Sequence, residues 1–258
     1  MLTSQRKSLI LEQLAREGQV LSKTLSQQFN VSEDTVRRDL RELAAAGELQ
    51  RVHGGALPAS DAIVNFAGRQ LLNLDSKKRV AKKGAELISA GQVVIIDGGT
   101  TTAELVTFLP ADLNITVVTH SPGIALALVE HPLIEVILIG GKLFKHSVVT
   151  TGTTAIEGIA AIQADLFFMG VTGIHAQTGL TTGDYEEASV KRAFSRRAAE
   201  TIVLASAEKM NAASPFVIGE LSLANTMVID EEIEQNLLHS LEAAGVMVVT
   251  AQIGRAHV

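Results

Sequence analysis

Hydrophobic residues recur at helical spacing near the start of the chain and predict two short helices. Gly18 is expected to end the first helix, because glycine accepts the left-handed backbone of a helix C-terminus. Ser22 is in position to cap the second helix, and Asn30 marks the turn that follows it. The apolar positions of the two helices are Ile10, Leu11, Leu14, Leu25 and Phe29.

A third helix is predicted after Ser32, its N-cap, with Val36, Leu40 and Leu43 on the face that meets a small core. The other faces carry a hydroxyl and three guanidiniums, from Thr35, Arg37, Arg38 and Arg41. Two helices, a tight turn and an exposed basic helix are typical of helix-turn-helix DNA-binding domains. These polar residues, with Ser32, are therefore candidates to contact bases or phosphates.

The stretch 48–56 is interpreted as a hairpin wing, in which Gly54 and Gly55 allow a sharp reversal close to a phosphate backbone. Arg51 and His53 in this wing are expected to contact phosphate. For an arbitrary helix, the preceding arginines would be interpreted as a solvated face paired with acidic neighbours. The turn, the wing and the glycines favour DNA recognition instead.

Beyond residue 57, short apolar segments alternate with amphipathic ones, which is typical of an α/β fold with a largely parallel sheet. The predicted strands are 93–96, 115–119, 136–139, 166–169, 201–205, 226–229 and 246–250, with 93–96 and 136–139 expected to be buried. The predicted helices are 103–109, 123–129, 153–161, 186–197 and 232–244. We predict a winged helix-turn-helix domain over 1–57, a linker over 58–74 and an α/β domain over 75–251.

The first of these strands leads directly into Asp97, Gly98, Gly99, Thr100, Thr101 and Thr102. Two glycines let the backbone approach an anion, the threonines offer hydroxyl donors, and a helix N-terminus adds free N–H groups. The segment lacks the Lys of a Walker A loop and the spacing of a dinucleotide fingerprint, so nucleoside triphosphates and NAD fit it poorly. A phosphate cradle and a plain strand-to-helix turn are both open interpretations.

The run V-S-x-x-T-x-R-R-D-L, which starts at Val31, and the later R-x-H-G-G, which starts at Arg51, resemble the DeoR family of bacterial transcription regulators. The likeness extends over nearly the whole chain. It implies a C-terminal domain that senses phosphorylated sugars and resembles ribose-5-phosphate isomerase and the CoA-transferase group in fold. By this resemblance residues 98–102 hold the phosphate, while Glu187 and Lys191 lie at the sugar end. The other candidate effector-binding residues are Asp97, His120, Ser121, Gly140, Gly141, Gly173 and Lys209.

Each of these candidates has a simpler interpretation. Glu187 and Lys191 are four residues apart and could form an ordinary exposed helix pair, and Asp97 could cap the turn and helix. Lys209 could be a phosphate donor or simply solvated. His120 stands where the family usually has Asn, and a lone His near a strand end is more often structural than ligand-binding.

A basic helix is predicted over residues 71–87, and its cations are expected to face water or a second copy rather than the effector. They are Lys77, Lys78, Arg79, Lys82 and Lys83. Residues 252–258 do not continue the last predicted strand, and we interpret them as translated sequencing adapter.

The amino-acid composition indicates where the protein is located and whether it forms oligomers. The 258 residues include no cysteine, so disulfides and thiolate metal sites are excluded, and no cofactor or metal is expected. The apolar runs are too short to cross a bilayer and no signal peptide opens the chain, so a cytoplasmic protein without membrane contact is expected.

Residues 1–57 hold eight basic and seven acidic residues, a net charge of +1, while the other 14 basic and 21 acidic residues give −7. So weak a positive charge predicts a homodimer or homotetramer on DNA.

We therefore expect a DNA-binding transcriptional regulator, a repressor of a carbohydrate-utilisation operon, whose affinity for operator DNA changes when a phosphorylated sugar binds. The alternative is a sugar-phosphate isomerase with an appended DNA-binding domain. That enzyme would need a positioned general base, and Glu187 is the only good candidate, so no catalytic residues are predicted.

Overall fold

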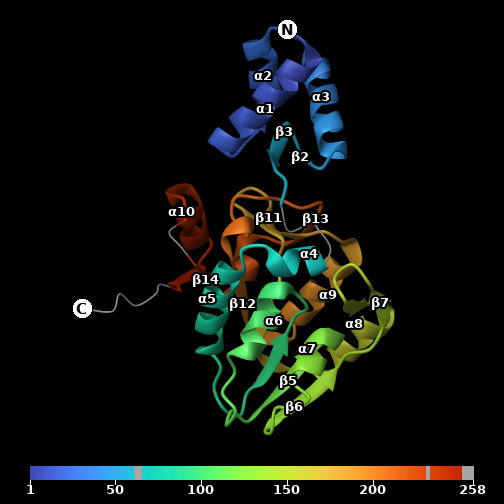
Figure 1. Cartoon of the computed structure of the whole chain (residues 1–258), viewed down its shortest axis with the longest axis vertical. Coiled ribbons are helices and arrows are strands. Elements are labelled where there is room, and N and C mark those ends of the chain that lie inside the picture. The colour runs from blue at the N-terminus through green and yellow to red at the C-terminus, as the bar shows by residue number, and fades with distance from the viewer. Residues whose placement is uncertain (61–65, 231–232, 252–258) are drawn as a thin grey trace, which may run out of the picture.

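The N-terminal domain is a three-helix unit with a small antiparallel sheet, and it sits above the larger domain in Figure 1. The structure is a computed structural model that describes residues 1–60, 66–230 and 233–251. The helices are α1 (Thr3–Glu17), α2 (Ser22–Phe29) and α3 (Glu33–Ala45). The strands β1 (Val20–Leu21), β2 (Leu49–Val52) and β3 (Gly55–Pro58) pair in the order β1-β3-β2. The predicted helix-turn-helix and wing are confirmed.

Local signals end and begin the helices mostly as predicted. Gly18 ends α1 with a φ of 68°, and Asn30 ends α2 with a φ of 51°. The side chain of Ser32 accepts a hydrogen bond from the backbone N–H of Thr35 and so caps α3. The prediction that Ser22 caps α2 is wrong, because Leu21 occupies the N-cap position and Ser22 is the first helical residue.

The larger domain is built on a seven-stranded sheet in which every pairing is parallel. The strand order is β15-β14-β12-β9-β4-β5-β6. The strands are β4 (Val93–Ile96), β5 (Ile115–Thr119), β6 (Ile134–Leu138), β9 (Ala164–Met169), β12 (Ala198–Ala205), β14 (Thr226–Ile229) and β15 (Met247–Thr250). The predicted largely parallel α/β fold is confirmed, with each strand boundary within three residues of its prediction.

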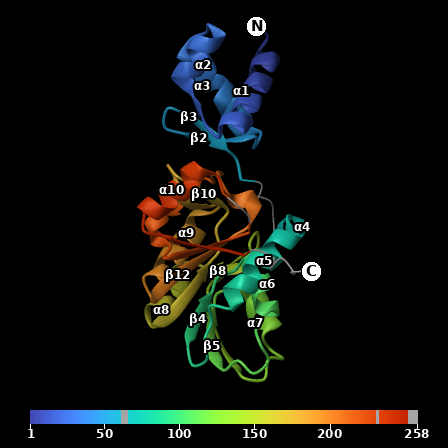
Figure 2. The ribbon, with the colours of Figure 1, turned by 90° about the vertical axis from the view of Figure 1, so that its left-hand side faces the viewer.

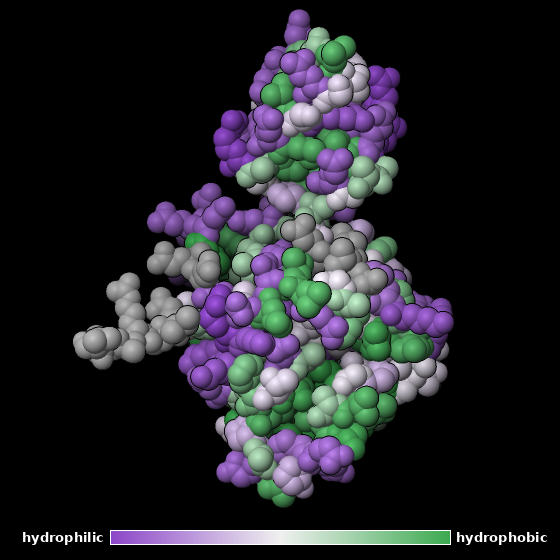
Figure 3. Space-filling model, in the orientation of Figure 1, coloured by the Kyte–Doolittle hydropathy of each residue, from purple (hydrophilic) through white to green (hydrophobic). Residues whose placement is uncertain are grey.

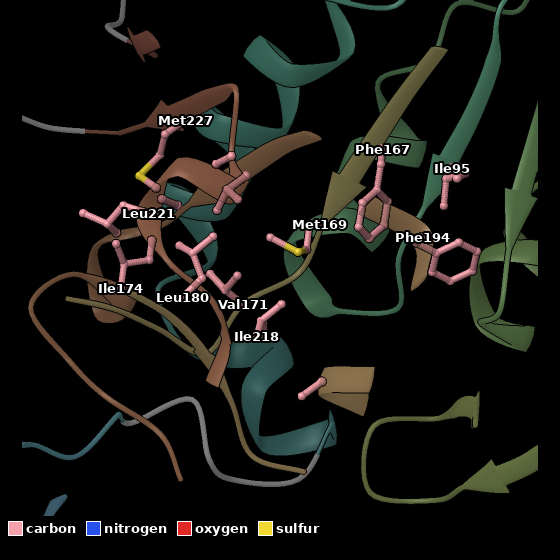
Figure 4. Close-up of a cluster of buried hydrophobic side chains, with 14 of the residues drawn as sticks. Ile95, Phe167, Met169, Val171, Ile174, Leu180, Phe194, Ile218, Leu221 and Met227 are labelled. Atoms are coloured by element: carbon pink, nitrogen blue, oxygen red, sulfur yellow. The ribbon is translucent and has the colours of Figure 1, made fainter. Parts of the chain in front are cut away.

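Helices cover both faces of this sheet, as Figures 1 and 2 show. They are α5 (Leu74–Ala85), α6 (Thr100–Thr107) and α7 (Pro122–Ala127) on one face, and α8 (Thr153–Ala160), α9 (Tyr185–Ser195) and α10 (Gln235–Ala243) on the other. Each face has its own apolar core. Phe167 and Phe194 belong to the core beneath α9, which Figure 4 shows continuing to Leu180 and Ile218.

Three features of this domain differ from the sequence predictions. Strand β6 is an edge strand rather than a buried one, and Leu138 is 49% exposed. The helix predicted over 71–87 is α5, which starts at Leu74, and a separate helix that was not predicted, α4 (Phe66–Leu71), precedes it; Asn73 with a left-handed backbone lies between the two. Several strands of three or four residues were not predicted, because so short a segment shows little periodicity. They are β7 (Lys142–Phe144), β8 (Val149–Thr151), β10 (Gly173–His175), β11 (Gly179–Thr182) and β13 (Phe216–Gly219).

Much of the predicted linker is part of the larger domain. Ala59 forms a parallel bridge with Ala213, and the hydroxyl of Ser60 donates to the carbonyl of Thr172. Further along, α4 packs near α6. Residues 61–65, residue 232 at the predicted start of the last helix, and the tail 252–258 lie outside the described residues.

Candidate DNA-binding and effector sites

Helix α3 presents its arginines to solvent. Arg37, Arg38 and Arg41 are all exposed, and Arg37 pairs with Glu33 one turn earlier at 2.8 Å. Within the described part of the chain, Arg38 and Arg41 have no ion-pair partner. The face that would meet DNA is thus partly neutralised by its own helix and partly free.

The buried face of α3 is fixed by an ion pair that the sequence analysis missed. Asp39 is fully buried, and its carboxylate receives both Nε and Nη2 of Arg6 on α1, at 2.5 and 3.1 Å. The Asp39 carboxylate also raises the pKa of Arg6, against the opposing effect of burial. This bidentate pair ties α3 to α1. The acidic residue of the R-R-D-L run is therefore structural.

The other predicted DNA contacts differ in their surroundings. The hydroxyls of Ser32 and Thr35 lie 2.9 Å apart, so each is already used at the start of α3. Arg51 on the wing is exposed. His53 is exposed too, but it lines a groove of about 850 Å³ that the wing shares with residues 176–179 of the larger domain. Gln19 and Gln177 join the two domains beside it.

The second candidate site is a small cavity at the carboxyl ends of β4 and β9. From this point the chain adds β5 and β6 on one side and β12, β14 and β15 on the other, so the order of the strands reverses here. Ligands of open α/β sheets bind at such switch points. The cavity has a volume of about 30 Å³.

The loop after β4 forms one wall of the cavity. Gly98, Gly99 and the three threonines 100–102 all line it, and Gly99 is the N-cap of α6. No side chain accepts from the first N–H groups of α6 at this cap, and the helix dipole is positive there. A Cβ on Gly98 would lie 2.1 Å from Val149, whereas one on Gly99 would meet only Thr102 Oγ1, at 3.2 Å. The arrangement can accept an anion.

Lys209 stands beside this helix N-terminus. Its ammonium donates to Thr101 Oγ1 at 2.8 Å and to the carbonyl of Leu204 at 3.1 Å, and the residue is 5% exposed. Burial is the main reason that its pKa falls to about 8. The interpretation of Lys209 as a solvated lysine is wrong.

Glu187 and Lys191 are also buried, so the exposed helix pair considered for them is wrong as well. Both line the cavity from α9, and Lys191 reaches the carboxylate of Asp97 at 2.5 Å. Glu187 lies 3.9 Å from Lys191 and accepts a hydrogen bond from Ser147 at 3.1 Å. These side chains form the wall opposite α6.

Asp97 lies beneath the cavity and does not line it. It is fully buried, accepts from the N–H of Gly170 at 2.8 Å, and lies 2.7 Å from Nε2 of His120. Burial alone would raise its pKa, but Lys191 and His120 outweigh burial and lower that pKa to about 2. Asp97 does not cap α6, and its carboxylate binds Lys191 from outside the cavity lining.

His120 also lies outside the cavity lining. Its Nδ1 lies 2.8 Å from the carbonyl of Thr150, so both ring nitrogens face partners within the protein. The ring packs edge-on against Phe194. His120 has the structural surroundings that the sequence analysis gave as its simpler interpretation.

Four further predicted residues lie outside the lining. Ser121 is the N-cap of α7, and Gly140 is exposed before β7. A Cβ on Gly141 would lie 2.7 Å from the carbonyl oxygen of Thr151, and one on Gly173 would lie 2.5 Å from that of Ala212. Close backbone packing accounts for both of these glycines.

The sequence analysis missed three charged residues of the lining, which are Arg69, Lys77 and Glu208. Lys77, expected to face water, is 1% exposed, lines the cavity from α5 and lies 3.8 Å from Glu208. Burial lowers its pKa. Arg69 on α4 is 8% exposed and donates to Ser147 Oγ at 3.2 Å. For the two cations, the only signal in the sequence was the density of cations in 69–83. That density by itself predicts a solvated surface as readily as a ligand site.

Comparison with known proteins identifies the family. The model of a DeoR-like helix-turn-helix domain matches residues 6–61, and the model of the DeoR C-terminal sensor domain matches residues 72–231. The chain belongs to the DeoR family of transcriptional regulators. The chain is 33% identical to the HTH-type transcriptional regulator GlpR of Haloferax volcanii, over 96% of this chain and 98% of that one. It is 32% identical to a putative aga operon transcriptional repressor of Escherichia coli O157:H7, over 96% and 93% of the two chains.

A third relative is the glycerol-3-phosphate regulon repressor of Escherichia coli K12, which is 30% identical over 88% of this chain and 90% of that one. Among solved structures, ribose 5-phosphate isomerase A of Methanocaldococcus jannaschii matches with a TM-score of 0.40 and 19% identity, over 54% of this chain and 55% of that one. The described residues of this DeoR-family protein contain no helix long and apolar enough to span a membrane. They also contain no cluster of three or more side chains suited to hold a metal ion.

Proposed function

We propose that this DeoR-family regulator represses a carbohydrate-utilisation operon in the cytoplasm and responds to a phosphorylated sugar bound in the cavity. The relatives support the first part, since their names include the aga operon and the glycerol-3-phosphate regulon. The observation that carries the second part is the cavity itself, where the N-terminus of α6 and the ammonium of Lys209 face the same space.

The charges around the cavity favour a ligand with a single phosphate. The lining holds four cations, Arg69, Lys77, Lys191 and Lys209, and two carboxylates, Glu187 and Glu208. Asp97 beneath it offsets one more cation, which leaves a net charge of +1 together with the partial positive charge of the α6 N-terminus. A phosphate monoester carries about −1.5 to −2 at pH 7 by the measure of phosphorylated side chains. The carboxylates and threonines can then hydrogen-bond the uncharged hydroxyls of a sugar.

We propose that the bound sugar is not transformed. Glu187 is the one candidate base that the sequence offered, and its carboxylate is already occupied by Ser147 and lies near Lys191. A general base must reach the proton that it abstracts. Purified protein should leave ribose 5-phosphate unchanged in an isomerase assay, and turnover that disappears in Glu187→Gln would contradict this.

We also propose that the regulator acts as a homodimer or homotetramer. The +1 charge of residues 1–57 is too small for one DNA-binding domain to hold an operator firmly. A surface for a second copy is available at the free edge of β6 and on α7, where Figure 3 shows a hydrophobic area. Its exposed apolar residues are Leu126, Val129, Leu133, Ile137 and Leu138. Light scattering should give a multiple of the chain mass, and Ile137→Lys together with Leu138→Lys should reduce it.

The effector proposal is tested by thermal unfolding with matched pairs of ligands. Glycerol 3-phosphate, glucose 6-phosphate and fructose 1-phosphate are compared with glycerol, glucose and fructose, because a ligand that binds the native state raises its Tm. At least one ester should raise the Tm while its free polyol does not. Equal shifts within every pair would contradict a phosphate cradle.

A further inference from the structure

The cavity is too small for the ligand that it is proposed to bind. A free volume of about 30 Å³ is well below the roughly 300–1,000 Å³ of sites for small-molecule ligands. If the proposed function holds, part of the wall must therefore move when the effector enters.

Helix α4 is the part of the wall that is least bound to the rest of the domain. The loops after β4, β9 and β12 are anchored by strands of the central sheet, and the helix α9 packs in one of its cores. In contrast, none of the described residues of α4 belongs to either core, and Leu71 at its end is 82% exposed. Contacts that hold it include the N–H of Phe66 on the carbonyl of His146, at 3.0 Å, Arg69 on Ser147, and the ammonium of Lys77 on the carbonyl of Arg69.

Arg69 is the α4 side chain that reaches into the cavity, and it is left incompletely bonded there. Although the residue is 92% buried, its Nε has no hydrogen-bond partner among the described residues. Burial lowers the pKa of this guanidinium, and the carboxylates of Glu187 and Asp97 offset only part of that effect. A buried donor without an acceptor destabilises the protein, and a charged donor does so more strongly. An oxygen of a bound anion would remove this cost.

We propose that effector entry displaces α4 and that Nε of Arg69 then donates to an oxygen of the phosphorylated ligand. This inference rests on the proposed function and extends it, since it assigns the moving element and a further effector-binding residue. The charge-assisted hydrogen bond gives the ligand differential affinity for the displaced position, which is what shifts an equilibrium.

The position of α4 in the chain links this movement to the DNA-binding domain. Ser60, where the described part of the N-terminal segment ends, donates to the carbonyl of Thr172, and Thr172 itself lines the cavity. Helix α4 starts shortly after Ser60. The effector thus acts on the chain at both sides of this connection, through Thr172 and through Arg69. Occupancy of the cavity therefore changes the contacts that attach the DNA-binding domain to the larger domain.

The displacement is tested with inorganic phosphate and a pair of spin labels. The chain has no native cysteine, so Gln70→Cys on α4 and Lys145→Cys near Ser147, both exposed positions, can be labelled without background. We expect the distance between the labels, measured by electron paramagnetic resonance, to increase on addition of phosphate to the full-length protein. A distance that is unchanged at a phosphate concentration that saturates the rise in Tm would overturn the displacement.

The role of Arg69 is tested with Arg69→Gln and its neighbour Gln70→Ala as the control. The phosphate concentration that gives half of the maximal Tm shift should rise about tenfold or more in Arg69→Gln, and it should not change in Gln70→Ala. Equal values in Arg69→Gln and the wild type would overturn the assignment of Arg69. If Arg69→Gln does not fold, the label distances decide the question. If phosphate fails to stabilise even the wild type, the cradle itself is wrong and this inference falls with the proposed function.

Discussion

The same charge pattern has opposite meanings in the two domains. Glu33 and Arg37 on α3, like Glu187 and Lys191 on α9, are a carboxylate and a cation four residues apart. The side chains of the first pair are 41% and 57% exposed, and those of the second pair are 6% and 2% exposed. An exposed pair contributes about 0–1 kcal/mol and can exchange its partner for a DNA phosphate. A buried charge must keep a partner, so the second pair is tied to Asp97 and Ser147.

This difference shows where each domain can respond to a ligand. The cations of α3 are in water and can meet DNA without a change in the protein. The cations of the cavity surround a free volume of only about 30 Å³, which must widen before an anion can bind among them. The proposed DNA-binding surface is therefore preformed, while the proposed effector site is coupled to a movement.

The largest expected effect comes from removing the cation of each pair. Lys191→Met leaves the buried carboxylate of Asp97 with one charged neighbour fewer and should lower the free energy of unfolding by about 3–5 kcal/mol. Arg37→Met should lower it by at most about 1 kcal/mol. Urea denaturation measures both. If the two variants lose similar stability, the contrast between the domains is wrong.

A second effect separates DNA affinity from stability on α3. Arg38→Ala and Arg41→Ala remove cations that have no ion-pair partner in the described structure, so the free energy of unfolding should change little. Each should weaken operator binding by about 1–3 kcal/mol if it contacts a base, or reduce the salt dependence by about one ion if it contacts a phosphate. Fluorescence anisotropy on labelled operator at several salt concentrations distinguishes these cases. Full affinity in the double variant would contradict the DNA-binding assignment.

The smallest effect is a pH dependence that belongs to the cavity alone. The pKa of Lys209 is lowered to about 8, and only the protonated ammonium attracts a phosphate dianion. Affinity for the phosphate ester should therefore be full near pH 7 and fall as the pH rises through 8, by less than about tenfold between pH 7 and 9. Calorimetric titration of the wild type and Lys209→Met checks this. The same slope in both would show that another group titrates.

The DNA-binding domain was largely predictable because its signals are local. The left-handed residues Gly18 and Asn30, the cap Ser32 and the glycine pair of the wing each act within a few residues of their position. The error at Ser22 concerns one position at a helix start. The Arg6–Asp39 ion pair could not be predicted, because its partners are 33 residues apart and nothing in their local pattern joins them.

The effector cavity was predictable only where strand ends supply its wall. Residues 98–102 follow a strand that periodicity identifies, and parallel strands carry their C-terminal loops to one edge. Arg69 and Lys77 were not found, because whether a cationic helix face is buried depends on what packs over it. Asp97 and His120 were predicted to contact the effector but are fully buried behind the lining. The sequence places them near the edge of the sheet but does not show which side chains are covered.

If an anion in the cradle of α6 controls operator binding, Gly99→Asp should weaken that control. The backbone at Gly99 is extended and a Cβ there meets only Thr102, so the new carboxylate adds negative charge at the α6 N-terminus with little disturbance of packing. Gly99→Ala is the matched control for size. We would measure operator occupancy against the concentration of the phosphate ester that stabilises the wild type most. We expect the effector concentration for half-maximal release to rise at least tenfold in Gly99→Asp relative to Gly99→Ala. An identical response in the two variants would place the effector site elsewhere.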